Sequence, residues 1–211
     1  AIQLYQQGQC SKTEAQRLLA FCNNSGPAFI LGAVGAGVFG SGRAGLALYL
    51  CHMAASLMVG LLFRFYRPGE GPSSPRRMGE RFQAVSFSAA FPRSVTGATL
   101  SGLLDGAAGL LSALPPPLRL SPEWSRRLLV GALELSSGVY SLTDGSLTGR
   151  LSMAAFMLGW AGRSVHCQGL AFLGDSGLPM RTYLTGKLLH GGLSALLMGA
   201  LAPRLAPTLS V

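Results

Sequence analysis

Charged side chains are scarce in this sequence: they make up 12% of 211 residues, and only eight are acidic. An ordinary soluble domain carries about twice that share of charge. Hydrophobic residues make up 49% of the chain, which is too apolar for an intrinsically disordered protein. The 29 glycines suit membrane helices that pack closely. We therefore predict an all-α fold, a polytopic bundle of transmembrane helices, with residues 1–211 as a single transmembrane domain.

The motifs of common enzymes and metal sites are also missing. The sequence holds no HExxH, no GxSxG and no Walker loop, and its three histidines lack local metal-ligand spacing. The four cysteines form no CxxC pair, and two of them lie in apolar runs. This pattern argues against a disulfide framework or a zinc site and favours buried packing residues. We expect no enzymatic activity, no metal and no cofactor.

The basic residues give a formal net charge of +9, but their distribution does not fit a nucleic-acid surface. Arginines gather between apolar runs, and no basic patch is interleaved with aromatic residues. Such clusters are typical of cytoplasmic loops of membrane proteins. We expect the lipid bilayer of a cell membrane as a partner and no nucleic acid. The clustered residues are Arg64, Arg67, Arg76, Arg77 and Arg81.

Apolar runs predict four membrane spans and two shorter, broken segments. A run of about 13 residues is too short to cross a hydrocarbon core of about 30 Å, so the short segments indicate half-helices or re-entrant segments. The predicted spans are residues 45–63, 94–114, 151–173 and 183–201, and the broken segments are residues 28–40 and 128–142.

The remaining segments are polar or mixed. Ser11 to Glu14 forms a capping box, which predicts a surface helix to about Cys22. Its predicted buried face holds Ala15, Leu18, Leu19 and Cys22. We also expect that residues 1–211 are a fragment of a longer protein. The other predicted segments are a loop at residues 67–82, a surface helix or half-helix at 82–91 and a second basic loop at 115–127.

The two basic loops pose a conflict of orientation. A single span between them, at residues 94–114, would place them on opposite sides of the membrane. Either residues 82–114 form a hairpin, or the number of spans is wrong by one.

Two apolar segments are interrupted by a Ser-Gly pair, at Ser25-Gly26 and at Ser137-Gly138. Each is followed by a histidine with a serine four residues later, at His52 and at His190. Paired broken helices and weak repeats, here roughly residues 11–66 and 131–201, are the sequence pointer to a transporter site. Alternatively, the Ser-Gly pairs serve only helix packing.

Ionisable residues also fall within the apolar runs, where they face a cavity or form pairs. Glu134, beside the second break, suits a solute hydroxyl, an amine or a coupling cation. Its alternative role is a structural pair with Arg163 or Lys187. His166 and His190 are candidates for proton carriers or for hydrogen bonds between helices.

Several motifs resemble one family. Residues 11–30, with the run RLLAFCNNSGPAFI, resemble the YlbJ-type sporulation integral membrane proteins. Three further stretches match that pattern, at residues 134–138, 159–168 (GWAGRSVHCQ) and 183–191. Residues 82–120 match poorly. The family belongs to the wider group that carries the nucleoside-recognition, or Gate, domain, and the repeats at 11–66 and 131–201 would be Gate-like.

The resemblance implies transport of a small organic anion, dipicolinate, across the membrane around the forespore during endospore formation. The alternatives are a nucleoside carrier, which requires an aromatic residue near the breaks, and a non-transporting membrane scaffold in spore assembly. A homo-oligomer is also compatible with this family. We expect the two breaks to face each other at a central substrate-binding site. The predicted site residues are Asn23, Asn24, Ser25, Gly26, Glu134, Ser137, Gly138, Arg163, His166, Gln168 and Lys187.

Overall fold

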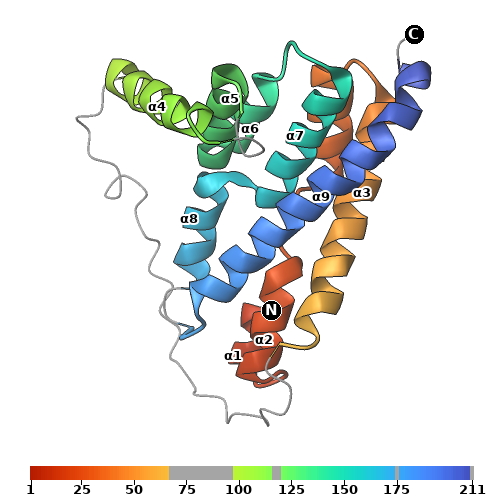
Figure 1. Ribbon diagram of the computed structural model, residues 1–211. Helices are drawn as coiled ribbons and strands as arrows, with labels where there is room; N and C mark the ends of the chain where they lie inside the picture. Colours follow the sequence, from red (N-terminus) through yellow and green to blue (C-terminus); the bar gives the residue numbers. More distant parts are fainter. Residues whose placement is uncertain (67–96, 116–119, 174–175, 210–211) are drawn as a thin grey trace.

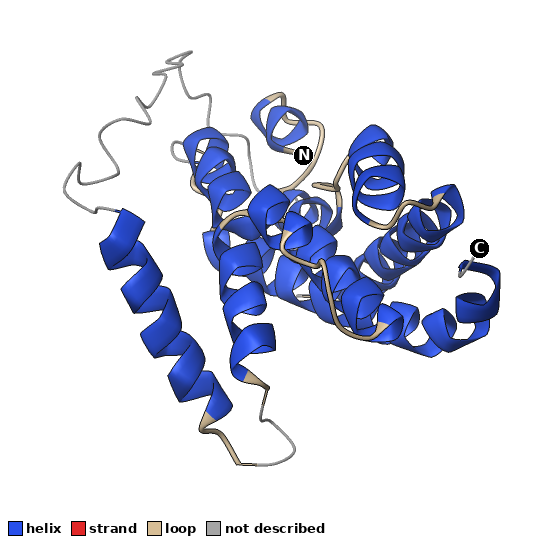
Figure 2. Ribbon diagram, turned by 90° about the horizontal axis from the view of Figure 1, so that it is seen from above, coloured by secondary structure: helices blue, strands red, loops and turns tan. Residues whose placement is uncertain are grey.

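The computed structural model describes residues 1–66, 97–115, 120–173 and 176–209, and these residues form helices joined by turns and loops, without a strand (Figure 1). Two long helices, α3 and α9, lie side by side through the molecule, and α7 packs along α9. Figure 2 shows the same bundle from above. The elements are α1 (Ile2–Gln6), α2 (Lys12–Phe21), the π-helix η1 (Phe29–Val38), α3 (Gly42–Phe63), α4 (Gly97–Ser112), α5 (Pro122–Leu133), α6 (Leu135–Tyr140), α7 (Leu147–Trp160), α8 (Gly162–Leu173) and α9 (Met180–Leu209).

Among the described residues, two helices are long and apolar enough to cross a membrane, judged by length and composition alone. They are α3 at Gly42–Phe63 and the segment Met180–Leu205 of α9. Both match predicted spans, at residues 45–63 and 183–201. The segment η1 is apolar but only 10 residues long, as expected of a half-helix at residues 28–40. The all-helical prediction is confirmed.

The other two predicted spans differ in their outcome. Of the span at 94–114, the structure describes the helix α4 over 16 residues, Gly97–Ser112, and residues 94–96 lie outside the described part. The run 151–173 is divided between α7 and α8, because Ala161 and Gly162 both take positive φ values, 75° and 80°. Left-handed residues end a helix.

The polar segments need two further corrections. The predicted loop at 115–127 is shorter than expected, because Ser121 caps a helix that begins at Pro122. The second break lies at Glu134, since residues 136–138 are already helical in α6. The predicted loop at 67–82 and surface helix at 82–91 lie outside the described residues.

The capping box of α2 is confirmed. The Glu14 backbone N–H donates to Ser11 Oγ at 3.2 Å, and the Ser11 N–H donates to Glu14 Oε2 at 2.7 Å. The bond from the Ser11 backbone N–H, followed by the bond with the Ser11 side chain, lowers the pKa of the Glu14 carboxyl below its ordinary value.

The predicted buried face of α2 is only partly right. Ala15 is buried, but Leu18 and Leu19 are half-buried and Cys22 is exposed. The helix packs against both α3 and α9, and its other buried residues are Thr13, Gln16 and Ala20.

The main core gathers apolar residues from η1, α3, α6, α7 and α9. Leu48, Leu158 and Met198 are fully buried there. Among the four free cysteines, only Cys51 is buried, so the expectation of buried packing cysteines holds for that residue alone.

Glycines allow the helices of this core to approach closely. A Cβ at Gly35 would clash with the backbone of Gly45, which brings η1 against α3. A Cβ at Gly159 would lie 2.6 Å from Gly191 Cα, where α7 crosses α9. The glycine content thus serves close helix packing, as predicted.

Candidate functional site

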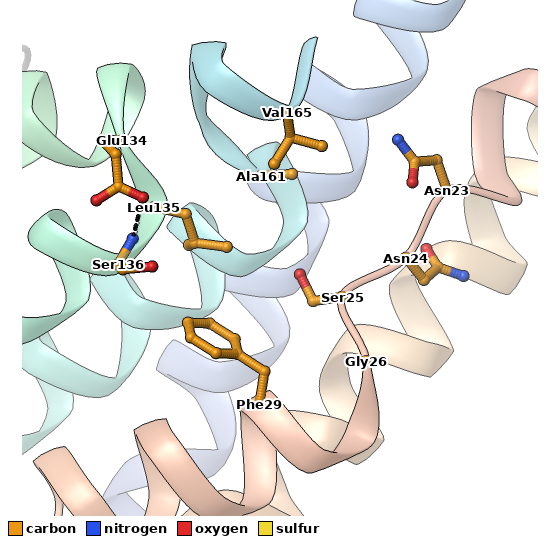
Figure 3. Close-up of a pocket in the computed structure, with 10 residues that line it drawn as sticks. All are labelled: Asn23, Asn24, Ser25, Gly26, Phe29, Glu134, Leu135, Ser136, Ala161 and Val165. Carbon is orange, nitrogen blue, oxygen red and sulfur yellow. Dashed lines mark hydrogen bonds between the residues drawn. The ribbon is translucent and has the colours of Figure 1, made fainter. Parts of the chain in front are cut away.

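One pocket lies where three interruptions of the helices meet (Figure 3). It has a volume of about 270 Å³. Residues of the first break, between α2 and η1, lie on one side of it, and residues around Glu134 lie on the opposite side. The lining residues are Asn23, Asn24, Ser25, Gly26, Phe29, Glu134, Leu135, Ser136, Ala161 and Val165.

The first break is held in place by its own polar side chains. Asn23 Nδ2 donates to Tyr183 Oη of α9 at 2.8 Å, and Asn24 Nδ2 donates to Ser56 Oγ of α3 at 3.0 Å. Ser25 Oγ donates to the Leu158 carbonyl of α7 at 3.2 Å. Each of the three residues is therefore fixed to a different helix. Local side-chain hydrogen bonding of Asn and Ser favours such non-helical backbone.

The second break is a single extended residue, Glu134, with φ −141° and ψ 119°. Its carboxylate accepts hydrogen bonds from the backbone N–H groups of Ser136 at 3.0 Å and Ser137 at 2.6 Å. A negative charge is stabilised at a helix N-terminus, where the N–H groups of the first turn lack partners within the helix. Glu134 thus caps α6, and these bonds replace the predicted pair with Arg163 or Lys187.

The third break, at Ala161 and Gly162, was not predicted, because the apolar run 151–173 reads as continuous. A Cβ at Gly162 would lie 2.9 Å from the Leu135 backbone nitrogen, so the third break packs against the second. The signal was local: the Ala161-Gly162 pair ends in a glycine at the point where α7 stops.

The two residues of this third break should respond oppositely to substitution. Ala161→Gly is expected to raise the stability by about 1 kcal/mol, because a left-handed conformation costs an L-residue about 1–2 kcal/mol and glycine almost nothing. Gly162→Ala is expected to lower it by at least as much, since its φ is also positive and its Cβ meets backbone. Thermal unfolding in detergent measures both. Equal shifts of the same sign would contradict the left-handed geometry.

The predicted site residues fall into two groups. Asn23, Asn24, Ser25, Gly26 and Glu134 line the pocket. The other six lie outside its lining.

Four of those six residues are either exposed to solvent or have a structural role. Arg163 and Gln168 are exposed, because α8 turns these positions away from the bundle. Ser137 is exposed and contributes its backbone N–H to Glu134. Gly138 is buried against Gly131, where it allows α5 and α6 to approach.

His166 and Lys187 stand directly behind the first break. Lys187 Nζ donates to the Asn23 carbonyl at 2.7 Å, and its side chain is fully buried. Tyr183 Oη lies 3.1 Å from His166 Nδ1 and also accepts from Asn23, so it joins α8, α9 and the break. Sequence reasoning missed Tyr183 as a site residue, although it opens a motif of the predicted family.

Each of the two predicted proton carriers, His166 and His190, forms a hydrogen bond to another helix, which was the alternative role. His166 contacts Tyr183 of α9, and His190 Nε2 lies 2.9 Å from the His52 carbonyl of α3. Proton transfer by either residue stays a prediction. Among the described residues, no group of three or more His, Cys, Asp or Glu side chains could hold a metal ion.

Comparison with known proteins extends these observations. The chain is 26% identical, over 227 aligned positions, to "Sporulation integral membrane protein YlbJ" of Bacillus subtilis (strain 168). The match covers 89% of this chain and 56% of that protein. The chain therefore spans little more than half the length of this curated relative.

No family model matches the chain, and no solved structure resembles it. The wider resemblance to the Gate domain and the two Gate-like repeats stay predictions. The match to YlbJ covers most of the chain, the fold is helical throughout the described residues, and two helices can span a membrane. The chain is therefore a membrane protein, all-helical in the part that the structure describes, and it is similar to the sporulation integral membrane protein YlbJ, the resemblance that its sequence motifs predict.

Proposed function

We propose that the chain forms part of a transporter that moves a small polar organic solute across the membrane through this pocket. The supporting observation is that three helix breaks converge on one pocket, which is lined by both polar and apolar residues. Free backbone groups are tolerated at membrane depth only where they are buried in protein or line a cavity. Secondary transporters bind their solutes at such discontinuous helices.

Dipicolinate, a planar aromatic ring with two carboxylates, is the proposed solute. The Asn23 and Asn24 side-chain amides each keep one N–H that can donate to a carboxylate, and Phe29 offers an aromatic face. Lys187 supplies a positive charge behind Asn23. The similarity to a sporulation protein is compatible with this solute and with a place in the membrane around a forespore. The lining carboxylate of Glu134 opposes an anion, but it is already neutralised in part by two N–H groups.

A nucleoside is the second candidate solute. Phe29 lines the pocket, whereas Tyr140 is exposed and Trp160 Nε1 donates to the Ala132 carbonyl. Phe29 could stack on a base, and the asparagine amides could hydrogen-bond to its edge. A scaffold without transport is less favoured, because packed helices without a cavity between the breaks would suit it better than this pocket does.

Ligand-dependent thermal shift on the full-length protein in detergent tests this proposal. A solute that binds only the folded state raises its stability by about 2.7 kcal/mol at 100 times the dissociation constant. A shift with dipicolinate alone supports the anion transporter. A shift with nucleosides alone supports the second candidate, and no shift with either favours the scaffold.

Replacing Glu134 by glutamine separates the two solutes. Glu134→Gln removes a negative charge but keeps an oxygen that can accept from the α6 N–H groups. We expect dipicolinate to bind about tenfold more tightly, because a repulsion of roughly 1.4 kcal/mol is removed. Nucleoside affinity should change by less than about threefold, within the size of one neutral hydrogen bond. Isothermal titration measures both, and weaker dipicolinate binding would contradict an anionic solute.

A further inference from the structure

Behind the pocket, α3 and α9 bring two histidines together in the protein interior. The rings of His52 and His190 have centroids 4.3 Å apart, and both side chains are completely buried. The sequence placed both in an internal echo, but it gave no reason for the two rings to meet. Their contact joins the two helices that are long enough to span the membrane.

Three of the four ring nitrogens of this pair have no partner within the described structure. They are both ring nitrogens of His52 and Nδ1 of His190, and the hydroxyl of Ser194, one turn further along α9, also has none. A buried polar atom without a partner costs about 1–3 kcal/mol. The one ring nitrogen with a partner is His190 Nε2, which must carry the hydrogen because the His52 carbonyl can only accept. His190 Nδ1 therefore holds a lone pair that is free to take a proton.

Two short chains of contacts connect the pair to the pocket. On α9, His190 lies three residues after Lys187, whose Nζ donates to the Asn23 carbonyl. On α3, His52 lies four residues before Ser56, whose hydroxyl accepts from Asn24. Residues three or four apart share one face of a helix. The pair thus stands one helical turn from both residues that anchor the asparagines of the first break.

The charge that acts on the pair comes from Lys187. Burial is the main factor that disfavours a proton on either ring. Among the described titratable groups of α3 and α9, and of α2 and α7 packed beside them, the fully buried Lys187 is the cation that adds to this effect at both rings. Within the described part of the chain, no carboxylate is bonded to Lys187, which is held by a backbone carbonyl. An anionic solute in the pocket would offset this charge and so favour a proton on the adjacent rings. By reciprocity, the proton would favour the anion by the same factor.

We infer that His52 and His190 together bind one proton that is coupled to binding of the anionic solute. In this scheme the pair is neutral while the pocket is empty. One proton from the side of entry adds to the His190 Nδ1 lone pair when the anion binds, and it leaves with the anion on the other side. The inference rests on the proposed function for its ligand, but not for the proton site itself.

The first experiment measures proton uptake on dipicolinate binding. Calorimetry of the full-length protein in buffers of different ionisation enthalpy, between about pH 6 and about pH 8, keeps the solute carboxylates ionised. We expect about one proton taken up per dipicolinate and an affinity that rises about tenfold per unit fall in pH. The double variant His52→Gln/His190→Gln should take up almost none, while its affinity at pH 8 stays within about threefold. Binding without proton uptake in the unsubstituted protein, or uptake that persists in the double variant, overturns the inference.

The second experiment needs no solute. Lys187→Gln removes the charge but keeps a donor for the Asn23 carbonyl, so it should allow the pair to take up a proton in the empty protein. Nitrogen NMR of labelled histidine should show ring titration at His52 or His190 above about pH 5 in this variant and not in the unsubstituted protein. Gly192→Ala, whose Cβ meets nothing within 4 Å, is the matched control on α9.

The two experiments separate the inference from the proposed function. A titrating pair in the Lys187→Gln variant without dipicolinate binding would support the proton site and refute the proposed solute. Rings that stay neutral in the Lys187→Gln variant would refute the proton site, whatever the solute does.

Discussion

Replacing Lys187 by methionine is expected to weaken dipicolinate binding about 30-fold. A unit charge acting over about 8 Å at an effective dielectric constant of about 20 contributes about 2 kcal/mol, which corresponds to that factor. Lys187 is fully buried, so salt screens it little, and its Nζ is fixed on the carbonyl of a lining residue, Asn23. Methionine fills nearly the same volume without the charge. Isothermal titration of the full-length protein measures the effect.

The matched control for this prediction lies on the same helix. Arg181 is exposed in the first turn of α9, so Arg181→Met also removes one positive charge but far less effectively for a buried anion. We expect it to change the affinity by less than about twofold. Equal losses in the two variants would mean that net charge matters and the position of Lys187 does not. An unchanged affinity in Lys187→Met would remove the electrostatic support for an anionic solute.

Gly159→Ala is expected to destabilise the protein by about 3 kcal/mol, at the upper end of the usual cost of overpacking. The new Cβ would lie 2.6 Å from Gly191 Cα, 2.7 Å from its nitrogen and 2.9 Å from the His190 carbonyl carbon. These are backbone atoms, so the clash can be relieved only by moving α7 away from α9. For a chain of this size, we expect the melting temperature in detergent to fall by about 10 °C.

Gly192→Ala supplies the comparison for the crossing of α7 and α9. It adds the same methyl group one residue further along α9, into open space. Alanine favours a helix over glycine by about 1 kcal/mol, so this variant should melt at the same temperature or higher. A similar loss in both variants would show that glycine is needed along α9 for a reason other than this close crossing. The effect on solute binding should follow that on stability, since the crossing also positions His190.

In the proposed mechanism, the pocket binds the solute and the histidine pair binds the proton. The first break supplies neutral donors at the pocket, and its backbone carbonyl holds the charge of Lys187 behind them. The pair lies one helical turn deeper, away from the pocket lining. Transport in this arrangement requires relative movement of the elements around the breaks, and Ala161, Gly162 and Glu134 are the residues whose backbone already departs from the helix.

The sequence by itself determined the features that depend on neighbouring residues. The capping box at Ser11 and Glu14 predicted the start of α2, because its hydrogen bonds join residues three apart. Long apolar runs predicted α3 and α9, since a membrane crossing needs about 20 such residues. The run from Asn23 to Pro27 predicted a chain break from local backbone chemistry alone. The expectation that the two breaks share one site came instead from their paired occurrence and from the family resemblance.

Only the tertiary structure decided which side chains meet. Arg163 and Lys187 are both cations within apolar runs of the sequence. In the structure, however, Arg163 is exposed on α8 and Lys187 is buried behind Asn23. The side of a helix that faces the bundle depends on where its neighbours pack, and α8 begins at a turn that the apolar pattern concealed. The contact of His52 with His190 joins residues 138 positions apart. No local pattern specifies such a contact, because it is set by the close crossing of helices that glycines permit.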